Sequence, residues 1–246
     1  MLIHLLGHRL SFSFWKAFGF FVLGLCFVGL FLFGSEVYRN VQAIRHGDTN
    51  TFPRQRMDLS LSRAIASSNV TSEDLAHLNS TNAPSLGSAS AKLTIVEFLD
   101  FDCPYSATAF NVVREAMETY KDRVRLIIRN FPVEELHPHA MNAALAAACA
   151  DDQSKYWSYH DKLFVNQTQH ESADLVRYAQ ETGMNMEKFR SCYDGHVHAD
   201  DIQTDVADGL RAGVQGTPTF FFNGIKVEGA QDRETFDFLI KRFLAL

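Results

Sequence analysis

Residues 93–106 read LTIVEFLDFDCPYS, an apolar run followed closely by a Cys-Pro pair. The run Leu93–Leu99 is short and rich in β-branched residues, which predicts a buried strand. After Pro104, apolar residues recur on one face of a helix as far as Tyr120. Proline suits the first helical turn, where its missing N–H costs nothing. We therefore expect a strand that leads into a helix beginning beside Cys103.

The residues that follow extend this unit into an α/β fold. Val124–Asn130 predicts a second strand, so that strand, helix and strand form a right-handed unit with parallel strands. Thr219–Val227 predicts a hairpin with Asn223-Gly224 in its turn, and a helix with Phe236 on its apolar face follows. Between these halves, helices are expected over Ala140–Ala150, Lys155–Val165, Leu175–Gly183, Met186–Tyr193 and His198–Ala212. The predicted order is βαβ, a helical insert and ββα.

An uncharged segment lies near the N-terminus. Residues 17–34 are eighteen residues without a charge, and a helix of that length spans about 27 Å, close to the hydrocarbon core of a bilayer. Residues 1–16 form a short flank before it. The run is long for the core of a signal peptide, and no small-x-small cleavage site follows it. We expect an uncleaved transmembrane signal anchor, with a cleaved signal and a buried helix as the alternatives.

The chain after this segment divides into a tether and a folded domain. Residues 35–91 are polar and rich in Ser, Asn and Thr, which predicts a linker without a function of its own. Residues 92–246 hold all the predicted strands and form the expected domain. Basic residues flank both ends of the anchor, so the positive-inside rule is nearly balanced.

Charge and histidine placement argue against two kinds of site. The net charge is −6, and from Lys92 onward sixteen basic residues stand against twenty-four acidic ones, so no basic face suggests nucleic acid. Two His-x-His pairs occur, at 137–139 and 196–198, but no closed ligand set at zinc-finger spacing appears. We expect no metal, no cofactor and no nucleic-acid partner.

Several motifs together resemble one family. Leu86-Gly87, the strand 94–98 and Asp102-Cys103-Pro104-Tyr105 resemble the entry to the active site of DsbA-like thiol–disulfide oxidoreductases, and residues 213–221 (GVQGTPTFF) resemble their cis-proline loop. The resemblance covers about residues 84–246. It implies a thioredoxin fold with an inserted helical subdomain, here about residues 137–212. The transmembrane helix expected from the uncharged run at 17–34 precedes this domain.

The site predicted from these motifs centres on Cys103. A cysteine at a helix N-terminus faces unsatisfied N–H groups and the positive end of the helix dipole, which favour the nucleophilic thiolate. The resemblance implies that Pro218 is cis and packs against Cys103, and that Thr217 pairs with substrate backbone. It also implies that Glu97 lies beneath the site and moves a proton. The alternatives are that Pro218 merely begins an edge strand and that Glu97 reaches solvent.

The active-site motif departs from the Cys-x-x-Cys of the family. It reads Cys103-Pro104-Tyr105-Ser106 here, so the thiol that normally releases a mixed disulfide is absent. Release then depends on a substrate thiol, on a small thiol or on a membrane redox partner. Beside Thr217, we expect Pro104, Tyr105 and Ser106 to contact substrate.

Cys149 and Cys192 both fall in the helical insert. Proteins similar to this one can carry a cysteine pair at these places, which implies a structural disulfide. Two buried free thiols and a resolving role for one of them remain as alternatives.

Two main functions follow from these observations. The first is a membrane-anchored oxidoreductase or isomerase that acts on protein cysteines through Cys103. Such chemistry suits an oxidising space, so we expect a single-pass cell-membrane protein with its C-terminal domain outside the cytoplasm. The alternative is a non-catalytic, chaperone-like module that binds peptides in the cis-proline groove, and a membrane-tethered structural subunit is a third candidate.

Overall fold

The computed structural model describes residues 35, 78–79 and 83–246. The anchor expected at 17–34 and most of the linker lie outside these residues. Within the part of the chain that is described, no helix is long and apolar enough to cross a membrane. The described residues 78–79 and 83–246 all fall within one compact unit.

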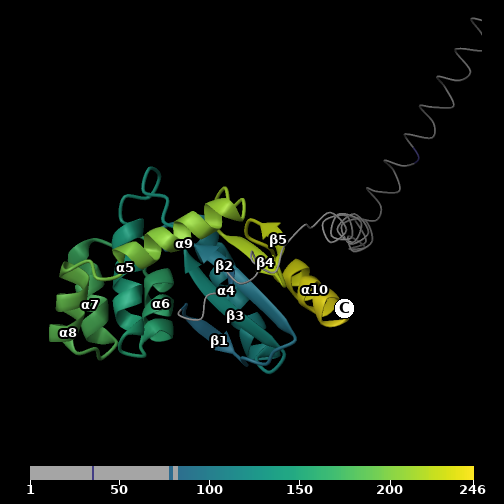
Figure 1. Ribbon diagram of the computed structural model, residues 1–246, viewed down its shortest axis with the longest axis horizontal. Coiled ribbons are helices and arrows are strands. Elements are labelled where there is room, and N and C mark those ends of the chain that lie inside the picture. The colour runs from purple at the N-terminus through teal and green to yellow at the C-terminus, as the bar shows by residue number, and fades with distance from the viewer. Residues whose placement is uncertain (1–34, 36–77, 80–82) are drawn as a thin grey trace, which may run out of the picture. The chain divides into compact units, whose positions relative to one another are not determined.

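The domain is built on a five-stranded sheet in the order β1-β3-β2-β4-β5 (Figure 1). Strand β2 (Leu93–Leu99) and strand β3 (Val124–Asn130) are parallel, and helix α4 (Pro104–Tyr120) connects them. Strands β4 (Thr219–Phe222) and β5 (Ile225–Glu228) form an antiparallel hairpin. These elements confirm the predicted βαβ unit and hairpin.

Five helices separate β3 from β4. Their bounds are α5 Ala140–Asp151, α6 Tyr156–Val165, α7 Ser172–Glu181, α8 Met186–Asp194 and α9 Ala199–Arg211. Helices α5 to α8 gather beside the sheet, whereas α9 runs back over it (Figure 1). The predicted helical insert is therefore confirmed, and α9 returns the chain to the sheet.

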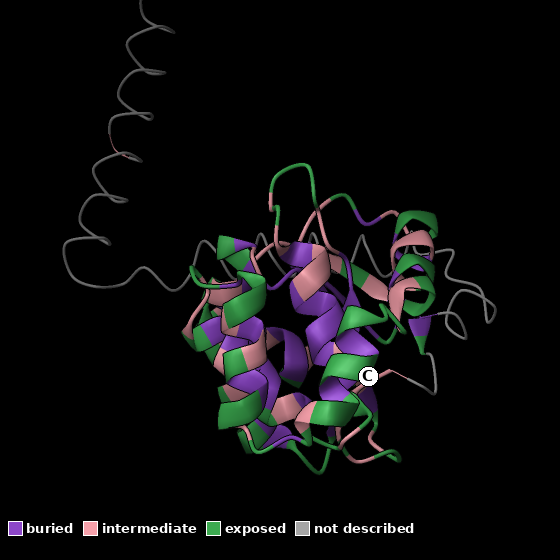
Figure 2. Cartoon of the chain, turned by 90° about the vertical axis from the view of Figure 1, so that its left-hand side faces the viewer, coloured by how far each residue is buried: buried purple, intermediate pink, exposed green. Residues whose placement is uncertain are grey.

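The sheet is covered on both faces. Phe220 and Phe222 contact Phe236 of the final helix α10 (Arg233–Leu244). Phe221 contacts Phe98, which lies against α9. Because successive strand side chains point to opposite faces, α10 and α9 cover opposite faces of the sheet. Buried residues accordingly line the interior between the elements, and exposed residues lie outside (Figure 2).

The folded domain begins earlier than the boundary expected at residue 92. Ser85–Gly87 forms strand β1, which pairs antiparallel with β3, and Leu78 is buried in the core. Residues 78–79 and 83–91 therefore belong with the domain, not with a tether. A strand of three residues is too short to show a periodic pattern in the sequence. Ser85–Gly87 is a strand because it pairs with β3.

Gly209 marks the closest approach of α9 to the sheet. A Cβ at this position would lie 2.8 Å from the ring of Phe131 and 3.0 Å from that of Phe98. We expect Gly209→Ala to lower the free energy of unfolding by about 1 kcal/mol, because overpacking costs about 1–3 kcal/mol and the helix preference of alanine offsets part of it. Urea unfolding measures the change. Gly216→Ala, where a Cβ meets nothing within 4 Å, is the control, and an equal loss there would contradict the packing argument.

Candidate active site

Cys103 lies at the junction between β2 and α4. It is the N-cap residue of α4, with Pro104 in the first turn, and its side chain caps no backbone N–H. The thiol is 4% exposed and is the one free cysteine among the described residues. The nucleophile predicted from the sequence therefore lies at a helix N-terminus with its sulfur just below the surface.

The cis-proline loop lies directly against Cys103. The Thr217–Pro218 peptide bond is cis, and the Cys103 thiol donates to the Thr217 carbonyl oxygen over 3.2 Å. A cavity of about 200 Å³ is lined by this loop and by residues of β4 and β5, including Glu228. The structure thus brings Cys103, Thr217 and Pro218 together, although 114 residues separate Cys103 from Thr217.

The two residues after Pro104 point in different directions. Tyr105 is 67% exposed and stands at the rim of the site. Ser106 is fully buried, and its Oγ accepts from the Asp100 backbone N–H over 3.5 Å. The expectation that Ser106 contacts substrate is therefore wrong in this structure, because the first turn of α4 directs it inward toward the end of β2.

Two aspartates hold the loop before Cys103: Asp102, which belongs to the quoted motif but was given no role, and Asp100, which lies just before that motif. Asp100 is buried, accepts from the Val133 N–H over 3.0 Å and lies 2.7 Å from Nδ1 of His137. Asp102 contacts Nδ1 of His170 and accepts from the His139 N–H over 3.2 Å.

These contacts join the active-site loop to the helical subdomain. Gln167 adds a hydrogen bond from Nε2 to the Cys103 carbonyl oxygen over 2.6 Å. His170 is itself buried, and its Nε2 lies 3.0 Å from the Leu163 carbonyl oxygen. The pattern Asp100-Phe101-Asp102 before Cys103 was the available signal, but its partners lie 33 to 68 residues away in the chain.

Glu97 is buried in the middle of the sheet. It lies opposite Ile128 of β3 and Phe220 of β4, and its side chain is 3% exposed. Burial raises its pKa from 4.5 to about 8. The alternative that it reaches solvent is therefore wrong, and at neutral pH it is mostly a neutral carboxylic acid, a form able to donate a proton.

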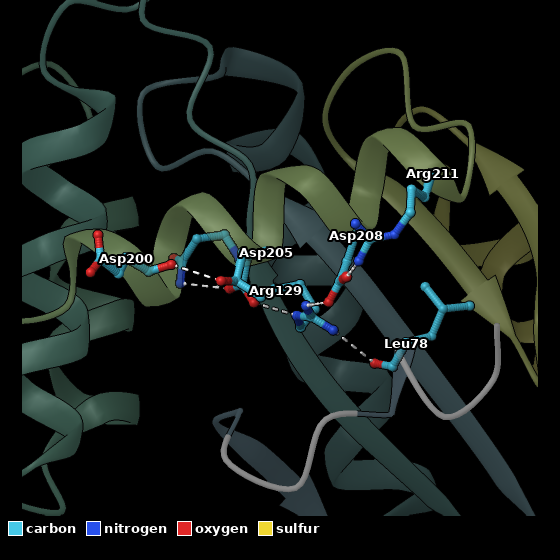
Figure 3. Close-up of polar contacts among 8 residues, drawn as sticks. Leu78, Arg129, Asp200, Asp205, Asp208 and Arg211 are labelled. Atoms are coloured by element: carbon cyan, nitrogen blue, oxygen red, sulfur yellow. Dashed lines mark hydrogen bonds and ion pairs between the residues drawn. The ribbon is translucent and has the colours of Figure 1, made fainter. Parts of the chain in front are cut away.

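A second polar cluster lies between α9 and β3 (Figure 3). Arg129 of β3 is 1% exposed and forms ion pairs with Asp205 and Asp208 of α9, while the Leu78 carbonyl oxygen lies 3.4 Å from its Nη1. Asp205 also accepts from the Asn130 N–H over 2.8 Å. Burial raises the pKa of Asp205 although Arg129 and Asn130 act in the opposite direction. This cluster fixes α9 on the sheet and is separate from the contacts around Cys103.

Cys149 and Cys192 form a disulfide that joins α5 to α8. Neither sulfur is therefore a free thiol in this structure. His198 lies beside the pair, and among the described residues these three form the one group of side chains close enough to hold a metal ion. Of the four histidines in the two His-x-His pairs, only His198 belongs to that group.

Comparisons with known proteins agree with this geometry. The family Thioredoxin_4, described as thioredoxin, matches residues 79–242. A thioredoxin-like oxidoreductase from Silicibacter pomeroyi DSS-3 is 27% identical, with a TM-score of 0.64 over 72% of this chain and 99% of that one. The thiol–disulfide exchange protein α-DsbA2 from Wolbachia pipientis has a TM-score of 0.65 at 18% identity, over 74% of this chain and 97% of its own, which shows the shared fold.

A similar sequence also occurs inside much longer proteins. The Na⁺/H⁺ antiporter NhaA 3 of Salinispora tropica is 38% identical over 148 residues, which are 60% of this chain and 22% of the antiporter. The chain thus spans about a fifth of the length of such relatives.

Proposed function

The chain belongs to the thioredoxin family, and from this membership we propose that it is a thiol–disulfide oxidoreductase or isomerase that acts on cysteine-containing proteins through Cys103 alone. The observation that carries the proposal is the free thiol of Cys103 at the start of α4, within hydrogen-bond distance of the Thr217 carbonyl oxygen. The thiolate of a cysteine is the species that attacks a disulfide.

The first step is exchange with a substrate disulfide. The Cys103 thiolate attacks one sulfur, a mixed disulfide forms, and the other substrate sulfur leaves as a thiolate. In the resting state the thiol proton of Cys103 forms a hydrogen bond with the Thr217 carbonyl oxygen. Once Cys103 has lost that proton, this oxygen becomes available to an N–H of an extended substrate peptide. The cavity beside Pro218 and the exposed Tyr105 provide the surface against which the peptide would lie.

The second step requires a thiol from outside the active site. Ser106 occupies the position of a resolving cysteine, and a hydroxyl cannot form a disulfide. A second thiol of the same substrate would yield isomerisation, whereas a small thiol or a membrane redox partner would regenerate Cys103 by monothiol exchange.

We also propose that residues 17–34 anchor the chain and that the domain lies outside the cytoplasm. The uncharged run of eighteen residues supports the anchor. The Cys149–Cys192 disulfide supports an oxidising compartment, since such bonds are rare in the cytosol. Antiport itself is not part of the proposal, because the shared segment is 22% of the antiporter.

A peptide-binding module without turnover is the second candidate. Two observations favour it: the absence of a resolving thiol, and the 4% exposure of Cys103, which limits access to the sulfur. The two candidates differ in whether a covalent intermediate forms.

Mixed disulfides should accumulate on the wild-type protein without an engineered trap. The step that clears them inside the active site is missing, so each adduct persists until an external thiol arrives. Cells that express the full chain are quenched in acid, and mass spectrometry then identifies the linked cysteine and its partner.

The matched variants make the test specific. Cys103→Ala should abolish the adducts, while Cys149→Ala should leave adducts on Cys103. In the wild type, where Cys149 and Cys192 form a disulfide, adducts that map to either of them would mean that the nucleophile is assigned wrongly. If no adducts form under oxidising conditions, the non-catalytic binder is the better description.

A further inference from the structure

Four metal-ligating side chains converge where α5, α8 and α9 meet. The sulfurs of Cys149 and Cys192 and a ring nitrogen of His198 all lie within 4.8 Å of one another. Asp152 lies three residues after Cys149, at the C-terminus of α5, and its Oδ2 is 3.6 Å from the Cys192 sulfur. The same oxygen is 2.9 Å from Nε2 of His198. Two sulfurs, one nitrogen and one oxygen therefore lie close together.

His198 is held in the orientation of a metal-binding histidine. Its Nδ1 lies 2.8 Å from Oδ2 of Asp201, three residues later on the first turn of α9. A carboxylate on one ring nitrogen fixes the ring and leaves the other nitrogen for the metal. Here the other nitrogen, Nε2, lies 2.9 Å from Oδ2 of Asp152, the carboxylate oxygen that also approaches the Cys192 sulfur.

An acidic cavity borders two members of this cluster, His198 and Asp152. Its volume is about 470 Å³, and His198, Asp152 and Asp201 form part of its wall. Asp151 and Asp205 also line it, so carboxylates dominate the charged lining. Such a cavity raises the local concentration of cations and provides an entry path for an ion.

We propose that reduction of the Cys149–Cys192 disulfide converts this cluster into a zinc site, with Cys149, Cys192 and His198 as ligands and Asp152 as the fourth. A dithiol supplies the two electrons and two protons that break the S–S bond, and it becomes a disulfide itself. One Zn²⁺ then binds, and the two cysteine thiol protons pass to solvent. The separated sulfurs can reach the distance of about 4 Å that two Zn–S bonds of about 2.3 Å require.

The mixed ligand set suits zinc in particular. Thiolate and imidazole ligands in tetrahedral geometry are typical of Zn²⁺, whereas Ca²⁺ and Mg²⁺ take oxygen ligands. In the oxidised protein the disulfide links α5 to α8. In the reduced protein the metal would link α5, α8 and α9, so the helical subdomain keeps a cross-link in both redox states.

The test uses the full chain in detergent, with Cys26 and Cys103 replaced by alanine so that only the pair contributes thiols. The disulfide is reduced with a phosphine, and zinc is titrated against a chromophoric chelator. We expect one zinc per chain after reduction and none before it. Co²⁺ should give sulfur-to-cobalt charge-transfer absorption in the reduced protein only.

Variants separate this site from adventitious binding. Asp201→Asn should weaken zinc binding by roughly 10–100-fold, as loss of an orienting partner does, and His198→Gln should weaken it further. His196→Asn, at an exposed neighbouring histidine, should have no effect. Zinc binding that survives in the Cys149→Ser/Cys192→Ser double variant would overturn the proposal.

Folding is followed in the same samples. Zinc should raise the thermal unfolding midpoint of the reduced protein and leave that of the oxidised protein unchanged. If reduction unfolds the helical subdomain, added zinc should restore its far-ultraviolet circular dichroism. A reduced protein that neither binds zinc nor recovers its helicity would also overturn the proposal.

Discussion

Ser106→Cys should increase the rate of dithiol oxidation roughly 100-fold or more. Ser106 lies three residues after Cys103 on the first turn of α4, so a thiol there would lie on the same face of the helix as the nucleophile. An intramolecular thiol acts at an effective concentration of about 1 mM or higher. At a concentration of about 10 µM, a small external thiol would therefore attack the mixed disulfide on Cys103 roughly 100-fold more slowly than the introduced thiol does.

The assay is oxidation of a peptide with two cysteines by glutathione disulfide, in the wild type and in the variant. Glutathione disulfide accepts the two electrons, and the introduced thiol displaces glutathione from Cys103 to form the internal disulfide that the peptide then reduces. Ser106→Ala is the control, because it removes the hydroxyl that accepts from the Asp100 N–H without adding a thiol. That control should retain the slow wild-type rate. A Ser106→Cys protein that oxidises the peptide no faster than the wild type would show that the buried site does not support thiol exchange, and the peptide-binding module would become the better candidate.

Glu97→Gln should stabilise the protein at alkaline pH and have little effect at acidic pH. The folded pKa of Glu97 is raised by burial to about 8, from 4.5 in the unfolded chain. Between these values the unfolded state loses the proton while the folded state keeps it, so stability falls as pH rises. Each pKa unit corresponds to about 1.4 kcal/mol, so the full loss by pH 8 is on the order of 5 kcal/mol.

Urea unfolding at pH 4, 6 and 8 measures this difference. The variant has no titrating group at position 97, so the gap between the two stability curves should widen steadily from pH 5 to pH 8. Glu115→Gln is a suitable control, because Glu115 lies on the exposed side of α4. Parallel pH profiles for wild type and Glu97→Gln would show that the carboxyl is not held in a protonated state by burial.

Local sequence patterns predicted most of the fold. Short apolar runs place β2 and β3 at their observed bounds, and the helical spacing of apolar residues does the same for α4. Asn223-Gly224 places the turn of the hairpin. These features depend on residues close together in the chain, whose spacing sets the face that each side chain occupies. Strand β1 was missed because its three residues acquire their structure from β3.

The active site also has some features that depend on adjacent residues and others that depend on residues far apart in the chain. Cys103, Pro104 and the absence of a resolving thiol at position 106 are properties of adjacent residues, so the sequence by itself determined that a single thiol begins a helix. It also determined that Glu97 falls within a strand.

Only the tertiary structure decided the surroundings of those residues. In the folded protein Glu97 and Ser106 are buried. Asp100 contacts His137, and Asp102 contacts His170. His198 lies beside Cys149 and Cys192. Each of these contacts joins residues from different elements, and the energy of a buried charge or hydrogen bond depends on those distant neighbours and on exclusion of water. The spacing of residues along the chain does not reveal these neighbours, because they meet only when the sheet and the helical subdomain pack together.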